Sequence, residues 1–174
     1  KKLQPESEVS ESMDSSTVGS VYHDTMYALY LGGVALDPEF DMDRKNVQAN
    51  VREPLKEITR EYIDRLIAEK DSIIRPKVRA LIRRQLNAEE VAGRNLVLEN
   101  VRDQYVLKTL EKDIELLREK KVDRFQIRGL ELEKWWTFDG FKFVGYIDRM
   151  DSFEPGVVRI VDYKTGKVED EDIN

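Results

Sequence analysis

Gly145-Tyr146-Ile147-Asp148-Arg149-Met150-Asp151 and Ile160-Val161-Asp162-Tyr163-Lys164-Thr165-Gly166-Lys167 are the two stretches of sequence that decide the fold. Between them Phe153-Glu154-Pro155-Gly156 has the composition of a turn, and the residues on either side alternate in polarity or are β-branched, as in strands. We predict an antiparallel hairpin with a three-residue connection centred on Pro155. This connection pairs Phe153 with Val157 and, further along the ladder, Asp148 with Asp162.

The predicted pairing gathers charged side chains at one spot. Opposite residues of an antiparallel ladder have Cβ atoms about 5 Å apart on the same face, and Lys164, two residues beyond Asp162, returns to that face. Two carboxylates this close share a proton or hold a cation between them, and Mg²⁺ prefers such oxygen ligands. The alternative is a solvated sheet face on which Lys164 pairs with the nearer aspartate. The second aspartate at the matching position and the flanking glycines favour the cation site.

Composition limits the class of protein. The chain has 174 residues, 37% of them charged, and a net charge of −6, which fits one polar domain. No apolar run approaches the ~20 residues that cross a bilayer, and no secretory signal is recognisable, so we expect a cytoplasmic protein without membrane contact. The absence of cysteine excludes disulfides, thiolate zinc sites and cysteine-held iron–sulfur clusters in this sequence. The acidic balance argues against a general nucleic-acid binder, although net charge does not describe a local groove.

Helices are predicted before the hairpin. Apolar residues at helical spacing predict a helix over 16–31, which carries His23, the only histidine, one turn after Gly19. Because Gly19 lies on the same helical face as His23, a strand can approach closely there and the imidazole can reach a metal. Further helices are expected over 54–70 and 76–86, and a long one from an N-terminal cap at 87–90 to Lys120, bent near Gly93.

The pattern changes to a period of two at Phe125. Strands are predicted over 124–137, 141–150 and 157–164, with Asp139-Gly140 as the first hairpin turn, so the sheet is a three-stranded antiparallel meander. The helices precede it in sequence, and we expect them on one face of the sheet. The alternating charges of the long helix are interpreted as a solvated face.

Three motifs in order, Gly19-x-x-x-His23, Gly145-x-x-Asp148-Arg149-x-Asp151 and Asp162-Tyr163-Lys164-Thr165-Gly166, resemble the RecB-type branch of the PD-(D/E)xK nuclease superfamily. The closest likeness is to the C-terminal nuclease domain of AddB-type helicase–nuclease subunits. The resemblance implies an α/β (α+β-like) fold with a restriction-endonuclease-like core in a single domain over 1–174. Its parts are the His-bearing helix 16–31, a helical insertion over 37–121 and the β-meander with the catalytic motifs over 123–167. The family's Gln-x-x-x-Tyr helix and last strand do not follow before Asn174, so we expect the C-terminal part of the core to be missing.

The resemblance also implies roles for individual residues. His23, Asp148, Asp162 and the backbone carbonyl of Tyr163 would bind Mg²⁺ or Mn²⁺, and Asp148, Asp162 and Lys164 would be catalytic. The activity implied is metal-dependent hydrolysis of DNA, as an exonuclease on single strands produced by a helicase subunit or domain during double-strand break repair and recombination. The alternative is a catalytically inactive module that binds DNA or a helicase partner.

Five further residues are considered for the site. Arg149 points away from Asp148 and is either structural or in contact with DNA. Trp135 and Trp136 could stack on bases, but neighbours in a strand face opposite ways, so one of them is expected in the core. Glu131 could join the metal ligands from the neighbouring strand, as could Glu133, although an exposed position at the sheet edge is favoured for both.

Overall fold

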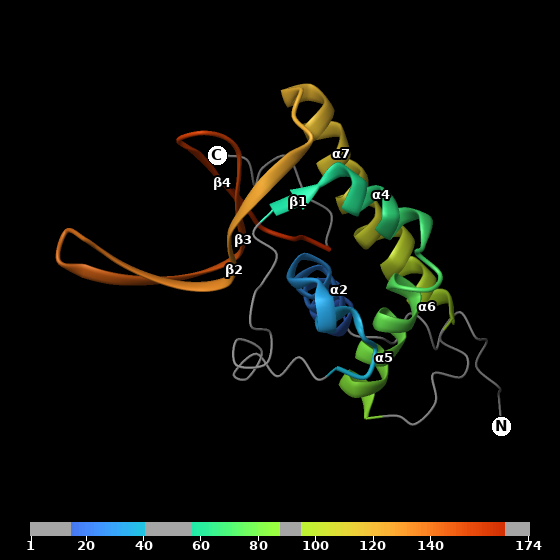
Figure 1. Cartoon of the computed structure of the whole chain (residues 1–174). Helices are drawn as coiled ribbons and strands as arrows, with labels where there is room; N and C mark the ends of the chain where they lie inside the picture. The colour runs from blue at the N-terminus through green and yellow to red at the C-terminus, as the bar shows by residue number, and fades with distance from the viewer. Residues whose placement is uncertain (1–14, 41–56, 88–94, 166–174) are drawn as a thin grey trace.

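The computed structural model describes residues 15–40, 57–87 and 95–165 (Figure 1). Helix α2 (Ser15–Leu31) lies between a four-stranded sheet and a group of helices. The helices are α4 (Arg60–Ala68), α5 (Ile74–Leu86), α6 (Asn95–Asn100) and α7 (Lys108–Lys120), and the strands are β1 (Glu57–Thr59), β2 (Arg124–Phe138), β3 (Phe141–Glu154) and β4 (Val157–Val161). The predicted mixed α/β fold is confirmed, whereas the proposed domain bounds stay a prediction.

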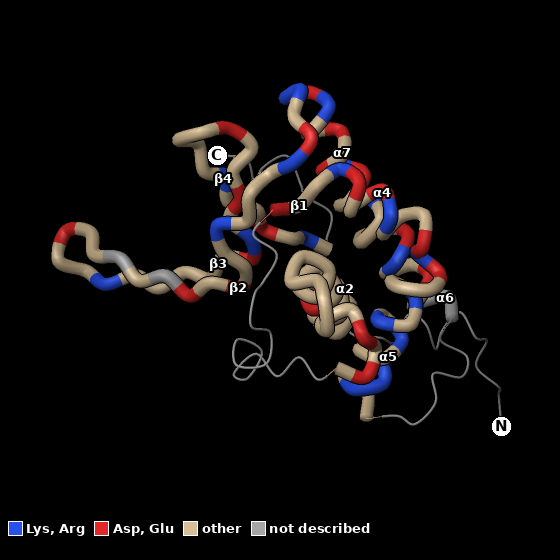
Figure 2. The backbone as a smooth tube through the Cα atoms, viewed as in Figure 1, with Lys and Arg blue, Asp and Glu red and all other residues tan. Residues whose placement is uncertain are grey.

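Helix α2 forms the centre of the core. Its only charged residue is Asp24, and from Tyr27 to Leu31 every side chain is buried. A helical segment that is buried on every side must be covered by several elements, and α2 contacts α5 and the sheet. The helix predicted over 16–31 is therefore confirmed to within one residue. Figure 2 shows how few charges lie on α2 compared with α4, α5 and α7.

The segment after Pro54 differs from the prediction. Residues 54–56 lie outside the described part of the chain, and Glu57–Thr59 forms strand β1, which pairs antiparallel with Arg124–Gln126. The β-branched Ile58 is fully buried there, and Thr59 then caps α4 by accepting a hydrogen bond from the Tyr62 amide at 3.1 Å. A helix predicted from apolar spacing alone was wrong at its start because strand pairing with β2 outweighs local helical periodicity.

The long helix is interrupted in its hydrogen-bonding pattern. Asn87 is left-handed (φ 48°) and ends α5, so the predicted N-cap is the end of the preceding helix. Gly93, where a bend was predicted, lies outside the described residues. From Asn95 to Lys120 the chain is helical, but Val101–Leu107 (η2) is a π-helix between α6 and α7. Such segments insert an extra residue into a helix and often occur at functional sites.

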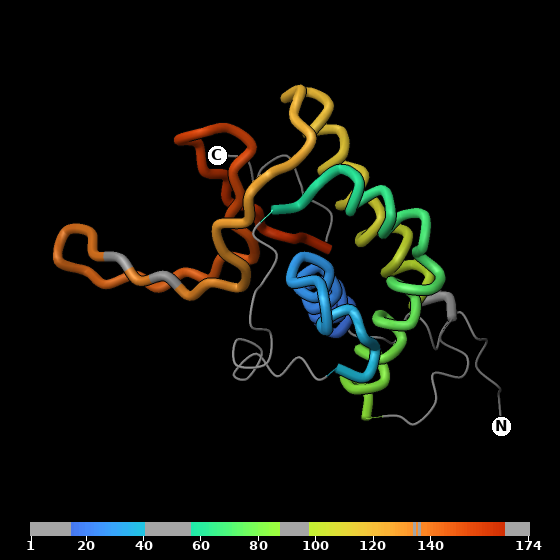
Figure 3. Tube along the Cα trace, in the orientation of Figure 1, coloured from blue at the N-terminus to red at the C-terminus, as the bar shows by residue number. Residues whose placement is uncertain are grey.

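The sheet is an antiparallel meander in the order β1-β2-β3-β4, so it has one strand more than predicted. Asp139 (φ 48°) and Gly140 (φ 79°) form the two-residue turn between β2 and β3, as predicted. This hairpin extends well beyond the helices (Figure 3), and its distal side chains, among them Phe138, Phe141 and Tyr146, are exposed. No helix among the described residues is long and apolar enough to cross a membrane.

The second hairpin has the predicted register but a different turn. Arg149 pairs with Val161 and Asp151 with Arg159, which is the register that places Asp148 across from Asp162. Near the turn, however, Glu154 pairs with Val157, so the connection has two residues, and the ladder shifts between Asp151 and Glu154. The three-residue turn was wrong because this irregularity takes up the extra residue within β3. Strand β4 ends at Val161 rather than at Lys164.

Candidate metal centre

His23 reaches the sheet from the middle of α2. Its Nε2 lies 2.8 Å from the carbonyl oxygen of Tyr163, just after β4, and its Nδ1 lies 3.4 Å from Oδ1 of Asp148 on β3. Three segments that are distant in sequence therefore meet at one imidazole ring. Gly19 lies where the helix faces the end of the sheet: a Cβ atom there would be 3.6 Å from the Thr165 hydroxyl oxygen, which is ordinary contact distance. The close approach predicted at Gly19 therefore involves Thr165, and alanine would also fit.

The carboxyl group of Asp148 is fixed from two sides. The Tyr163 amide donates a hydrogen bond to its Oδ2 at 2.7 Å, while His23 faces its Oδ1. A carbonyl oxygen only accepts, so Nε2 of His23 either donates a proton to the Tyr163 oxygen or lies beside it as a second ligand of one cation. With Nε2 as the ligand, Nδ1 carries the proton and faces Oδ1 of Asp148 with it.

Glu131 belongs to the same cluster. One ligand atom each from His23, Glu131 and Asp148 lies within 4.8 Å of the other two. The β2–β3 register explains this, because Leu130 pairs with Arg149 and Leu132 with Ile147, which places Glu131 directly across from Asp148. The exposed position favoured for Glu131 was therefore wrong. Counting back from the Asp139-Gly140 turn would have found this pair, because a two-residue turn fixes the register of the whole hairpin.

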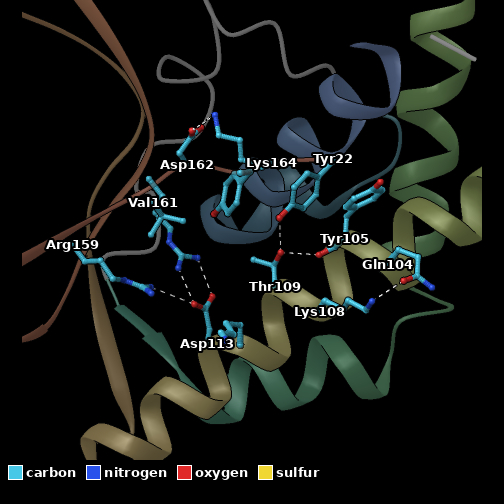
Figure 4. A pocket seen from close by; sticks show the side chains of 13 residues that line it. Tyr22, Gln104, Tyr105, Lys108, Thr109, Asp113, Arg159, Val161, Asp162 and Lys164 are labelled. Atoms are coloured by element: carbon cyan, nitrogen blue, oxygen red, sulfur yellow. Dashed lines mark hydrogen bonds and ion pairs between the residues drawn. The ribbon is translucent and has the colours of Figure 1, made fainter. Parts of the chain in front are cut away.

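Asp162 and Lys164 form the open side of the site. Lys164 Nζ lies 2.9 Å from Asp162 Oδ2, and the two side chains are 67% and 61% exposed (Figure 4). The carboxyl group of Asp162 also interacts with that of Asp148. The predicted gathering of these groups beside His23 is thus found, with Asp162 and Lys164 at the solvent side.

The two aspartates differ in their readiness to bind a proton. Burial raises the pKa of Asp148, and the nearby Asp162 raises it further, against the opposing effects of the Tyr163 amide and His23. The hydrogen bond from Lys164 lowers the pKa of Asp162, against the opposing effect of burial. Asp148 therefore favours a bound proton or cation, whereas Asp162 stays ionised to lower pH.

The donor set fits a hard divalent cation. It consists of an imidazole nitrogen, carboxylate oxygens and a backbone carbonyl. Nε2 of His23 and the Tyr163 carbonyl oxygen are 2.8 Å apart. Adjacent ligand atoms of an octahedral Mg²⁺ site with bonds of about 2.1 Å have a similar separation of about 3.0 Å.

A buried ion network lies behind the site. The guanidinium group of Arg149 is 1% exposed and donates to both oxygens of Asp113 at 2.9 and 2.8 Å. It also lies 2.9 Å from Asp151, which Arg159 contacts from β4. Because Arg149 is enclosed, its structural role is the correct alternative and contact with DNA is not. The sequence did not reveal Asp113, since the charges of its helix were interpreted as solvated, yet Asp113 is 2% exposed.

Trp135 has no part in this cluster. Trp135 is 65% exposed on the projecting hairpin. The side chain of Trp136, its neighbour, lies outside the described part of the chain, as do Gly166 and Lys167. Glu133 is exposed, in agreement with the favoured interpretation. The ring of Tyr163 is buried against Tyr22, with centroids 5.3 Å apart, so that its backbone rather than its phenol faces the site.

Comparison with known families supports this geometry. A family model described as the PD-(D/E)XK nuclease superfamily matches residues 1–174. Searches of curated proteins and of solved structures gave no match.

Proposed function

The chain belongs to the PD-(D/E)XK nuclease superfamily, whose members are in general metal-dependent hydrolytic nucleases, and on this premise we propose that it cleaves DNA phosphodiester bonds with Mg²⁺ or Mn²⁺. The observation that carries the proposal is the meeting of His23, Asp148 and the Tyr163 carbonyl group across 140 residues of sequence. A lone surface histidine would not require this arrangement.

The proposed ligands are His23, Asp148, Asp162 and the Tyr163 carbonyl, to which the geometry adds Glu131. A divalent cation held there would lower the pKa of bound water and polarise the phosphoryl oxygen. The Tyr163 amide and the His23 ring orient the Asp148 carboxylate, so that it need not reorganise when the substrate binds.

Lys164 is the proposed catalytic cation. Its ammonium group is held beside Asp162 and is accessible to a substrate. It would neutralise charge that develops on the scissile phosphate and orient the attacking water. Because hydrogen bonding to Lys164 keeps Asp162 ionised, the pair would enter the reaction with both charges in place.

The proposal also includes a biological setting. The motif resemblance to AddB-type subunits supports action on single-stranded ends supplied by a helicase during recombination repair. The alternative, an inactive module that binds DNA or a helicase, is less well supported because Asp148, Asp162 and Lys164 are all present.

Cleavage of a labelled single-stranded oligonucleotide in Mg²⁺ or Mn²⁺ tests the proposal. We expect activity that EDTA abolishes and that Asp162→Asn reduces at least about 100-fold, since a ligand and its charge are lost. Asp139→Asn, at the exposed hairpin turn, is the matched control and should retain activity because asparagine suits the same left-handed conformation. Binding of Mn²⁺ without cleavage of any oligonucleotide would favour the inactive module.

A further inference from the structure

A pocket adjoins the proposed site on the side of Lys164. It has a volume of about 320 Å³ and lies between η2, α7 and the segment that follows β4. Asp162 and Lys164 lie on one side of the pocket and Lys108, on α7, lies on the opposite side (Figure 4). Tyr163 and Lys112 also line it. A ligand in this pocket would therefore be in contact with the residues proposed to act on the phosphodiester.

The lining of the pocket is basic although the chain is acidic. Five of its residues are lysine or arginine and two are aspartate, whereas the whole chain has a net charge of −6. The charges of Arg149 and Arg159 are balanced by the buried Asp113 and Asp151. The excess positive charge therefore lies on lysines at the rim, where it favours an anion.

The hydroxyl groups of Tyr22, Tyr105 and Thr109 in the lining are used within the protein. Tyr22 and Thr109 share a hydrogen bond at 2.5 Å, Thr109 donates to the Tyr105 carbonyl at 2.7 Å, and Tyr105 donates to the Thr165 carbonyl at 3.0 Å. These hydroxyl groups stiffen the floor of the pocket but have little capacity for a neutral polar ligand. Recognition therefore depends on the ammonium groups.

Lys108 and Lys112 are suited to contact a charged strand. They are four residues apart on α7, so their Cα atoms are separated by about 6 Å along one helical face. Lys108 contacts the uncharged amide of Gln104 at 2.7 Å, and Lys112 contacts Glu115 at 3.5 Å in an exposed pair of small energetic value. Neither contact would compete strongly with a phosphate.

We propose that this pocket binds a phosphate–sugar unit of the substrate next to the scissile phosphate, with Lys108 and Lys112 as contacts to successive phosphates. The proposal rests on the proposed nuclease function and adds a direction to it: the substrate strand leaves the metal centre along α7. It also resolves the conflict between an acidic protein and a polyanionic substrate, because the positive charge is concentrated where the strand would lie.

The test compares two double variants in binding a fluorescent single-stranded oligonucleotide, with Ca²⁺ in place of Mg²⁺. Lys108→Gln with Lys112→Gln removes both contacts. Arg79→Gln with Arg118→Gln removes the same charge from exposed positions of α5 and α7 outside the pocket. For the lysine variant we expect affinity to fall roughly tenfold or more at low salt. The slope of log affinity against log salt should decrease by about 1.4, because each phosphate contact in a single strand contributes about 0.7. The arginine variant should stay within about twofold of the wild type.

A methylphosphonate scan locates the contact. One uncharged linkage next to the scissile phosphate should weaken binding to the wild-type chain and have little effect on the lysine variant. If the lysine variant keeps the wild-type affinity and salt slope, or if the arginine variant loses as much, the pocket proposal is overturned.

The outcomes also separate this proposal from the proposed function. Metal-dependent cleavage that is insensitive to both lysines would leave the nuclease assignment intact and reject the pocket. If the oligonucleotide binds in a lysine-dependent way but is not cleaved, and if Mn²⁺ does not bind, the pocket proposal stands and the nuclease assignment is rejected.

Discussion

Two clusters of charged side chains lie on opposite faces of β3 and differ mainly in their exposure to water. Arg149, with Asp113 and Asp151, points into the protein, and all three side chains are at most 3% exposed. Asp148, the residue before Arg149, points to the face on which Asp162 and Lys164 are more than 60% exposed. Alternation along one strand thus separates charges that hold the fold from charges that can bind a ligand.

The difference lies in how completely each charge is paired. Asp113 receives two hydrogen bonds from Arg149 and one from Tyr30, so no ligand is needed to stabilise it. Around Asp148, carboxylates gather beside a single imidazole, and a proton or cation must balance them. Substitutions in the buried cluster should therefore lower stability, whereas substitutions around Asp148 should lower activity or metal affinity. The expected effects decrease in the order given below.

Arg149→Met should have the largest effect. It leaves Asp113 buried with its principal partner removed, and breaking a buried pair on one side typically costs about 3–5 kcal/mol. We expect the free energy of unfolding, measured by urea denaturation, to fall by about this amount. An equally stable variant would show that the network is not what holds α7 against the sheet.

Lys164→Ala should reduce activity and leave stability almost unchanged. Loss of a charge that stabilises the transition state typically costs about 2.7–4 kcal/mol, or a factor of about 10² to 10³ in turnover. Removing an exposed ion pair costs at most about 1 kcal/mol of stability. Turnover measured at saturating Mg²⁺ and calorimetric Mn²⁺ affinity separate these effects. Arg118→Ala, an exposed residue of α7, serves as the control, and a parallel loss of metal affinity would contradict the assigned role.

Glu131→Gln tests whether the ligand found from the β2–β3 register takes part. Removing one carboxylate from a cation site should weaken Mn²⁺ binding by roughly tenfold, an effect smaller than the loss of Asp148. Glu133→Gln, two residues along the same strand and exposed, should leave the calorimetric affinity unchanged. Equal effects of the two substitutions would show that only general negative charge matters.

The smallest effect should be a difference in the pH dependence of stability between the Asp148→Asn and Asp162→Asn variants, measured in EDTA so that no metal is bound. The folded protein raises the pKa of Asp148, so its contribution to stability is greatest at low pH and declines as pH rises through that pKa. The pKa of Asp162 is lowered, so its contribution appears as pH rises and is lost again in acid. Between acid and neutral pH, Asp148→Asn should therefore gain stability relative to the wild type and Asp162→Asn should lose it, each by less than about 1 kcal/mol. Urea denaturation at several pH values measures both, and changes of the same sign would contradict the assignment.

Local patterns predicted the elements that depend on local chemistry. The apolar run of α2 and the turn at Asp139-Gly140 were confirmed because each follows from periodicity or turn geometry. The register of Arg149 against Val161 is also the predicted one, but it results from a two-residue turn and an irregularity in β3 rather than from the predicted three-residue turn. That His23 reaches the sheet was expected from Gly19 on the same helical face, the family resemblance added Asp148 as its neighbour, and the structure contains this contact.

The features that sequence analysis missed depend on tertiary contacts. Strand β1 exists because β2 offers an edge to Ile58, which is distant in sequence. Asp113 looks like any charge on an exposed helix until its partner Arg149 is known. The position of Glu131 across from Asp148 could have been derived, because the hairpin register was already determined by its turn.

The π-helix of Val101–Leu107 has a consequence for the tolerance of this chain to deletions. Each residue of a regular helix turns the chain by about 100°, and the π-helix holds one additional residue in nearly the same total rotation. Removing one residue from η2 would therefore allow regular helix while Lys108, Lys112 and Asp113 keep their direction relative to α6. A single-residue deletion should accordingly be better tolerated in η2 than within α7, where it would turn every residue that follows by about 100°.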